Sequence, residues 1–162
     1  VWYAKIITCI IYIVLANTIL MLCNVAGGFI IQHIFDIPMT ISSMQALFGT
    51  LCIILASIWN IPLCLWFTKK VGVFATLILN VGMSFMLGTL GANTSFWFIC
   101  PYSWVTRLMV LTLGILPNGE SVTGSALSTP LPLVIMTICL SLLLLYTISK
   151  STAKSFIKQE VL

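Results

Sequence analysis

The stretch IITCIIYIVLANTILMLCNVAGGFII, residues 6–31, contains no charged side chain over twenty-six positions. A helix that crosses a membrane needs about 20 mostly apolar residues, because each residue advances the helix by about 1.5 Å and the hydrocarbon layer is about 30 Å thick. The stretch meets both requirements. It therefore indicates that the rest of the chain folds with lipid, rather than water, as its main solvent.

The composition of the whole chain supports this interpretation. Of the 162 residues, 60% are hydrophobic and 6% are charged, whereas a soluble domain carries about 25% charged residues. Three acidic and seven basic side chains cannot cover a water-facing surface of this size. We therefore expect an all-α integral membrane protein that forms a single transmembrane domain over residues 1–162.

Four apolar runs are long enough to be membrane-crossing helices. They cover residues 6–31, 44–67, 71–91 and 131–148. The segment 92–130 connects the last two runs, and the tail 149–162 follows them. The sequence starts at Val1 without the pattern of a signal peptide. We interpret it as the later part of a longer membrane protein.

The basic residues predict the orientation of these helices. All six lysines lie at the ends of apolar runs that alternation places on one side of the membrane, and cytoplasmic loops carry an excess of lysine and arginine. They are Lys5, Lys69, Lys70, Lys150, Lys154 and Lys158. This side is expected to be the cytoplasm, with the C-terminus on it. Arg107 is the only basic residue predicted on the other side, near the belt-forming aromatic residues Trp97, Tyr102 and Trp104.

The outer segment 92–130 contains an apolar stretch that is too short to cross a membrane. Residues 106–116 number only eleven and lie between Pro101 and Pro117. This pattern is typical of a re-entrant or interfacial helix in the outer leaflet. Arg107 could then reach lipid headgroups or Glu120. The segment either anchors the helix bundle at the interface or contacts a substrate, and the sequence leaves both possibilities open.

Small and polar residues recur at helical spacing within three of the runs. Lipid tails are as apolar as leucine, so such residues mark faces where helices pack against one another. The predicted polar stripe consists of Asn17, Asn24, Asn60, Asn80, Ser84 and Gly88. A second stripe in the same run as Asn60 consists of Gly49, Cys52 and Ala56. We expect the asparagines to face other helices, either as hydrogen-bonding contacts or as the lining of a transport path. Pro62 predicts a kink near Ile58.

Several kinds of chemistry have no motif in this sequence. We find no GxxxxGK[ST] loop for ATP, no HExxH and no GxSxG. The six cysteines form no CxxC pair, and His33 is the only histidine, so we expect neither a metal site nor another cofactor in this chain. The bases form no single patch, which argues against nucleic acid. We therefore expect a membrane protein without enzymatic activity of its own.

Two stretches together carry a family resemblance. They are LASIWNIPLCLWFTKKVGVFATLILNVG, residues 55–82, and FWFICPYSWVTRLMVLTLGILPNG, residues 96–119. They resemble the permease subunits of lantibiotic-protection (immunity) ABC transporters, within the type-2 ABC exporter permeases. The pieces PYSWVxRL and ILPNG are the most specific. The resemblance implies a six-span subunit, of which this chain would contain spans three to six, with short helices in the outer leaflet between the last two spans.

The resemblance also implies a function and partners. The subunit would remove a cationic antimicrobial peptide from the bacterial cytoplasmic membrane of the producing cell. A separate subunit would bind and hydrolyse ATP with Mg²⁺, and a second permease subunit would complete the complex. The outer surface that meets the peptide would consist of Trp97, Tyr102, Trp104, Arg107, Asn118 and Glu120. Alternatives are an ABC exporter for another antibiotic or a lipid-linked substrate, part of a secondary transporter, and a scaffold or sensor subunit that does not transport.

Overall fold

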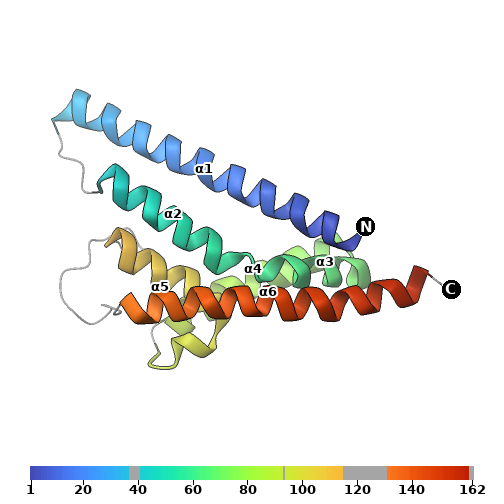
Figure 1. Ribbon diagram of the computed structural model, residues 1–162. Helices are drawn as coiled ribbons and strands as arrows, with labels where there is room; N and C mark the ends of the chain where they lie inside the picture. The colour runs from blue at the N-terminus through green and yellow to red at the C-terminus, as the bar shows by residue number, and fades with distance from the viewer. Residues whose placement is uncertain (37–40, 93, 115–130, 161–162) are drawn as a thin grey trace.

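The computed structural model describes residues 1–36, 41–92, 94–114 and 131–160, with side chains up to residue 155. Over these ranges the protein is entirely helical, as predicted, with six α-helices and one short 3₁₀ helix (Figure 1). The elements are α1 (Trp2–Phe35), α2 (Ser43–Ser57), α3 (Asn60–Val71), α4 (Val73–Ala92), η1 (Trp97–Ile99), α5 (Pro101–Leu113) and α6 (Leu131–Glu160).

Three helices are long and apolar enough to cross a membrane, and a fourth crossing is possible. The three are α1, α4 and α6, and the bent pair formed by α2 and α3 gives the fourth if it counts as one span. The prediction of an all-helical protein with several candidate membrane-crossing helices is therefore confirmed. Figure 1 shows the N-terminus, α3 and the C-terminal end of α6 at one end of the bundle. The lysines of the described helices belong to these segments, so they gather at this end.

The second predicted run is not one continuous helix. It forms α2 and α3, which meet at Ile58 and Trp59 with an angle of 44° between them. Pro62 explains the break, because it has no N–H to donate to the carbonyl of Ile58 and its ring clashes with that carbonyl in a regular helix. Pro62 lies instead in the first turn of α3, where a missing N–H is tolerated. The predicted kink is thus a complete interruption.

The other end of α2 begins with well-formed capping chemistry. The Ser42 hydroxyl accepts a hydrogen bond from the Gln45 backbone N–H at 3.2 Å, and the Gln45 side chain accepts one from the Ser42 N–H at 3.0 Å. This capping box satisfies two donors that the first turn of a helix would otherwise leave free. It fixes where α2 starts.

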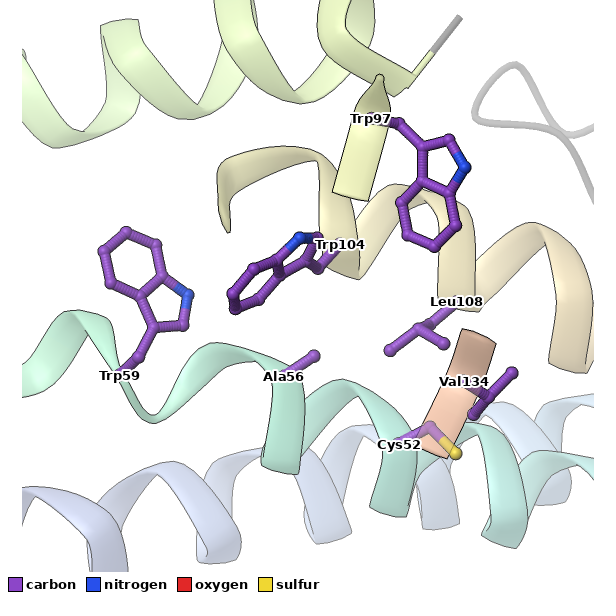
Figure 2. Close-up of a cluster of buried hydrophobic side chains, with 7 residues drawn as sticks. All are labelled: Cys52, Ala56, Trp59, Trp97, Trp104, Leu108 and Val134. Atoms are coloured by element: carbon purple, nitrogen blue, oxygen red, sulfur yellow. The ribbon is translucent and has the colours of Figure 1, made fainter. Parts of the chain in front are cut away.

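The inward face of α2 packs along α5, and the two helices run in opposite directions. Figure 2 shows Cys52 and Ala56 of α2 facing Leu108 and Trp104 of α5, with Trp59 next along the row. The stripe of small residues predicted in this run is therefore a helix-packing face. It lets the large side chains of α5 lie close to the backbone of α2. α5 starts beside the α2–α3 break and ends near the start of α2.

At the far end of this contact, Gly49 has no room for a larger side chain. A β-carbon on Gly49 would lie 2.9 Å from Cδ2 of Leu113 and 3.0 Å from Oγ1 of Thr112. A β-carbon on Gly82 of α4 would meet nothing within 4 Å. The two glycines both lie inside long apolar helices, so they form a matched pair for testing the α2–α5 contact.

We expect Gly49→Leu to lower the free energy of unfolding by about 1–3 kcal/mol, because overpacking forces the two helices apart. Gly82→Leu should leave it within about 0.5 kcal/mol, since the new side chain meets only lipid. Unfolding in mixed micelles, followed by circular dichroism, measures both values. Equal effects of the two substitutions would contradict the close approach of α2 and α5.

α6 crosses the bundle and joins its two apolar clusters. Val134 belongs to the cluster between α2 and α5, and Ala153 belongs to a second cluster with Trp2 and Ile6 of α1. Between them, the fully buried Ser141 donates a hydrogen bond to the Leu55 carbonyl of α2 at 2.6 Å. Apart from its first turns, α1 has mostly exposed apolar side chains, which suits a lipid-facing helix.

Candidate functional site

Three helices are joined by hydrogen bonds between polar side chains at the point where α2 breaks. The side-chain amide of Asn60 donates to Oδ1 of Asn80 at 2.7 Å, and the hydroxyl of Tyr102 donates to the same oxygen at 3.1 Å. The thiol of Cys64 lies 3.5 Å from Oδ1 of Asn60. We call Asn60, Cys64, Asn80 and Tyr102 the polar junction. It connects α3, α4 and α5.

The local sequence explains why these residues meet. Asn60 is the first residue of α3, directly after the break, and Tyr102 is the second residue of α5. Asn80 lies seven residues into α4, about 10 Å along a helix that continues for a further 18 Å or so. The first turns of α3 and α5 thus both contact the middle part of α4, a candidate membrane-crossing helix. Unpaired amides and hydroxyls are costly at such a depth, so their mutual hydrogen bonds stabilise the arrangement.

Aromatic rings surround the polar junction on the α2 side. The ring of Trp59 packs edge-to-face against Tyr102, with 5.2 Å between centroids, and against Trp104, with 6.4 Å. Trp104 is 2% exposed, and its indole Nε1 donates to the Phe98 carbonyl at 2.9 Å. The fully buried Ser103 donates to the Trp97 carbonyl at 2.6 Å. These bonds fasten η1 onto the first turns of α5.

Arg107 ties the end of α4 to α5. Its side chain is only 8% exposed, and its Nε donates a hydrogen bond to the carbonyl of Ala92, the last residue of α4. Its guanidinium carbon lies 5.6 Å from the ring centroid of Trp97. A cation is favourable at a helix C-terminus, where backbone carbonyls lack partners. A guanidinium keeps its proton in proteins, so Arg107 brings a positive charge to this position.

Three of the residues in the predicted outer surface are buried within this chain. Trp97, Trp104 and Arg107 are buried and Tyr102 is half-buried. The reason is that the short helix begins at Pro101 and ends at Leu113, whereas the apolar stretch suggested 106–116. Tyr102 and Trp104 therefore belong to a helix that packs on α2 and α4, and Trp97 lies in η1, directly before that helix. Asn118 and Glu120 lie outside the described residues, so the suggested contact between Arg107 and Glu120 stays a prediction.

The residues of the predicted polar stripe have different environments. Asn60 and Asn80 are bonded to each other across two helices, and Gly88 is buried beside α5. Ser84 and Asn24 are exposed within this chain. Asn17 is half-buried.

The asparagine amides of α1 are not left unpaired in lipid. Asn17 donates to the carbonyl of Ile13 at 2.8 Å, and Asn24 donates to that of Leu20 at 2.9 Å. Each amide thus finds a partner four residues earlier in its own helix. A lipid-facing asparagine can satisfy one donor in this way without a second helix.

Sequence reasoning missed two kinds of contributor. Thr137 and Ser141 of α6 are fully buried, and their spacing of four residues was the available signal. Trp59 contacts both Tyr102 and Trp104. A tryptophan three residues before Pro62 falls at the predicted kink, where a large side chain can fill the space that the bend opens.

Within the described part of the chain, no group of three or more histidine, cysteine or acidic side chains could hold a metal ion. Comparison with known protein families, curated proteins and solved structures gave no match to this chain. The candidate site is therefore characterised by its own geometry. It is a polar junction with an aromatic wall, located where a broken helix meets the start of a short one.

We expect Arg107→Lys to lower the free energy of unfolding by about 1–2 kcal/mol, although it preserves the charge. The planar guanidinium donates to the Ala92 carbonyl and lies over Trp97, whereas an ammonium is a compact, strongly hydrated ion that makes a poorer stacking partner. Lys154→Arg, at an exposed position of α6, should change stability by less than about 0.5 kcal/mol. Thermal unfolding in the same detergent tests both. If Arg107→Lys is as stable as wild type, the packing of the guanidinium group contributes little to stability.

Proposed function

We propose that this chain is the membrane-spanning permease part of an ABC exporter, and that its substrate is a lantibiotic or a related cationic antimicrobial peptide. On this proposal the exporter removes the peptide from the membrane of the producing cell. The sequence resemblance over residues 55–82 and 96–119 suggests the family. The helical bundle with three to four candidate spans agrees with a permease.

The observation that carries the proposal is the position of α5. It lies between the last two candidate spans in the chain, α4 and α6, and is too short to cross a membrane. It starts beside Trp59 and ends beside Gly49, near the start of α2. If the lysine-bearing end faces the cytoplasm, α5 occupies the outer half of the membrane as a re-entrant helix. The resemblance implies short helices of this kind between the fifth and sixth spans.

On this proposal, the other subunits of the exporter are separate chains. An ATP-binding subunit would supply Mg²⁺-dependent hydrolysis, and a second permease subunit would form the other half of the pathway. α1, the α2–α3 pair, α4 and α6 would correspond to spans three to six. The buried residues Trp97, Trp104 and Arg107 would shape α5 rather than touch the peptide. Phe96 and Ile99, which are 68% and 67% exposed, are better placed for direct contact.

The test uses producer cells whose own copy of this gene is deleted and replaced by a tagged gene. Wild type should restore tolerance to a lantibiotic, and an ATP-binding subunit should co-purify with it. Phe96→Ala combined with Ile99→Ala should reduce tolerance at least several-fold without reducing the amount of complex. Phe74→Ala combined with Ile78→Ala, which removes two exposed apolar side chains of α4, is the matched control.

The outcomes separate the alternatives. The wild-type gene could fail to raise the lantibiotic tolerance of the deletion strain while an ATP-binding subunit still co-purifies. This result would indicate an exporter for another substrate, which a panel of antibiotics would identify. Transport activity without any such subunit would indicate a secondary transporter. If neither transport activity nor an ATP-binding partner is found, the chain is a scaffold or sensor subunit and the proposal is wrong.

A further inference from the structure

α6 is longer than a membrane crossing requires. Its 30 residues extend about 45 Å, whereas the hydrocarbon layer is about 30 Å thick. Counted from Leu131, Lys150 lies about 28 Å along the helix axis. If Leu131 lies at one boundary of the hydrocarbon, Lys150 lies at the other boundary and the turns that follow lie among the lipid headgroups on the lysine-bearing side.

A shallow groove lies on α6 at this depth. It has a volume of about 210 Å³ and is lined by Tyr146, Thr147, Lys150, Ser151 and Lys154. The Nζ atom of Lys150 is 3.2 Å from the Tyr146 hydroxyl and 5.4 Å from the centroid of its ring. The tyrosine therefore holds the first ammonium group in place. Lys154 presents the second one turn further along the helix.

The lining of this groove suits a phosphate group. Its lining residues offer two ammonium groups and the hydroxyls of Tyr146 and Ser151, and they include no acidic side chain. The Thr147 hydroxyl already donates to the Leu143 carbonyl at 2.9 Å. Charge-assisted hydrogen bonds from ammonium to phosphate are among the strongest polar contacts in proteins, and hydroxyls can donate to the remaining oxygens. Asp36, the one described acidic side chain, lies at the C-terminal end of α1, away from the groove.

The surroundings favour a lipid over a soluble anion. Tyr146 is 63% exposed one turn closer to the hydrocarbon, beside the exposed apolar residues Leu142 and Leu143. An acyl chain can lie against this part of the helix while the headgroup reaches the two lysines. We propose that the groove binds the phosphate of an anionic phospholipid at the lysine-bearing membrane surface, and thereby fixes the depth of α6. This site does not depend on the proposed export function.

Native mass spectrometry of the full chain, purified in mild detergent, tests the proposal. Phosphatidylglycerol and phosphatidylcholine are added in equal amounts, and the bound lipids are counted. Wild type should retain phosphatidylglycerol preferentially. Lys150→Gln with Lys154→Gln should weaken its binding by about ten-fold per lysine removed, because each substitution removes a charge-assisted hydrogen bond to the phosphate. Tyr146→Phe, which keeps the ring but removes the hydroxyl that contacts Lys150, should weaken it by a smaller factor.

Lys69→Gln with Lys70→Gln provides the matched control. These two lysines are exposed at the end of α3, on the same end of the bundle and outside the groove, so the control removes equal charge. It should leave phosphatidylglycerol binding within about two-fold of wild type. If both double variants lose phosphatidylglycerol binding equally, the binding depends on total positive charge and not on the groove, and the proposal is overturned. Equal retention of the two lipids by wild type, or displacement of phosphatidylglycerol by millimolar inorganic phosphate, would also overturn it.

Discussion

Trp104→Ala is expected to lower the free energy of unfolding by about 3–5 kcal/mol, the largest effect of any single substitution considered for this protein. The side chain is 2% exposed and lies among Ala56, Trp59 and Leu108. Its removal leaves a cavity between α2 and α5, which the neighbouring backbones cannot fill. It also abolishes the edge-to-face contact with Trp59 and the hydrogen bond to the Phe98 carbonyl.

The measurement is unfolding in mixed micelles, with circular dichroism to report the loss of helix. Phe96→Ala is the control, because Phe96 is an aromatic residue of the same segment that is 68% exposed, and its removal should cost less than about 1 kcal/mol. If Trp104→Ala does not fold at all, Trp104→Phe should fold with an intermediate loss, since it keeps an aromatic ring. A Trp104→Ala protein as stable as wild type would contradict the buried position of this ring.

Asn80→Ala is expected to lower the free energy of unfolding by about 1–3 kcal/mol. Asn80 accepts hydrogen bonds from both Asn60 and Tyr102, so the substitution leaves two donors without their partner. Interhelical hydrogen bonds inside membranes contribute about 0.6 kcal/mol on average and up to about 1.7 kcal/mol each. Asn24→Ala is the matched control. Its amide is bonded within its own helix and is exposed, so we expect a change below about 0.5 kcal/mol.

A double-mutant cycle makes this prediction specific to the polar junction. Tyr102→Phe removes only the hydroxyl that donates to Asn80. If the hydrogen bond exists, the combined variant should lose at least about 0.5 kcal/mol less than the sum of the two single variants. Strict additivity would show that the two side chains act independently, and the junction would then be a coincidence of packing.

The membrane-crossing helices could be predicted from the sequence because their signal is strong and local. Long apolar runs and lysines at their ends suffice to place α1, α4 and α6, and Pro62 indicates where the second run bends. The stripe of Gly49, Cys52 and Ala56 correctly marked a packing face, because only close approach of a second helix uses small residues in this way.

The environment of α5 could not be predicted in the same way. A short apolar helix with one tryptophan and one arginine has the same pattern whether it lies at the membrane surface or is inserted between other helices. The difference arises from tertiary contacts, namely the fit of Trp104 against Ala56 and of Arg107 against the end of α4. Likewise, no sequence pattern distinguishes Asn24, which bonds to its own helix, from Asn80, which bonds to two others.

The interruption between α2 and α3 has a mechanical consequence. Trp59 lies within it and touches both Tyr102 and Trp104, while Asn60, the next residue, holds Asn80. The pair cannot straighten without pulling its indole ring away from the root of α5. A displacement of the lysine-bearing end of α3 would therefore also displace α5, because both helices are attached to Trp59 and Asn60 at the interruption.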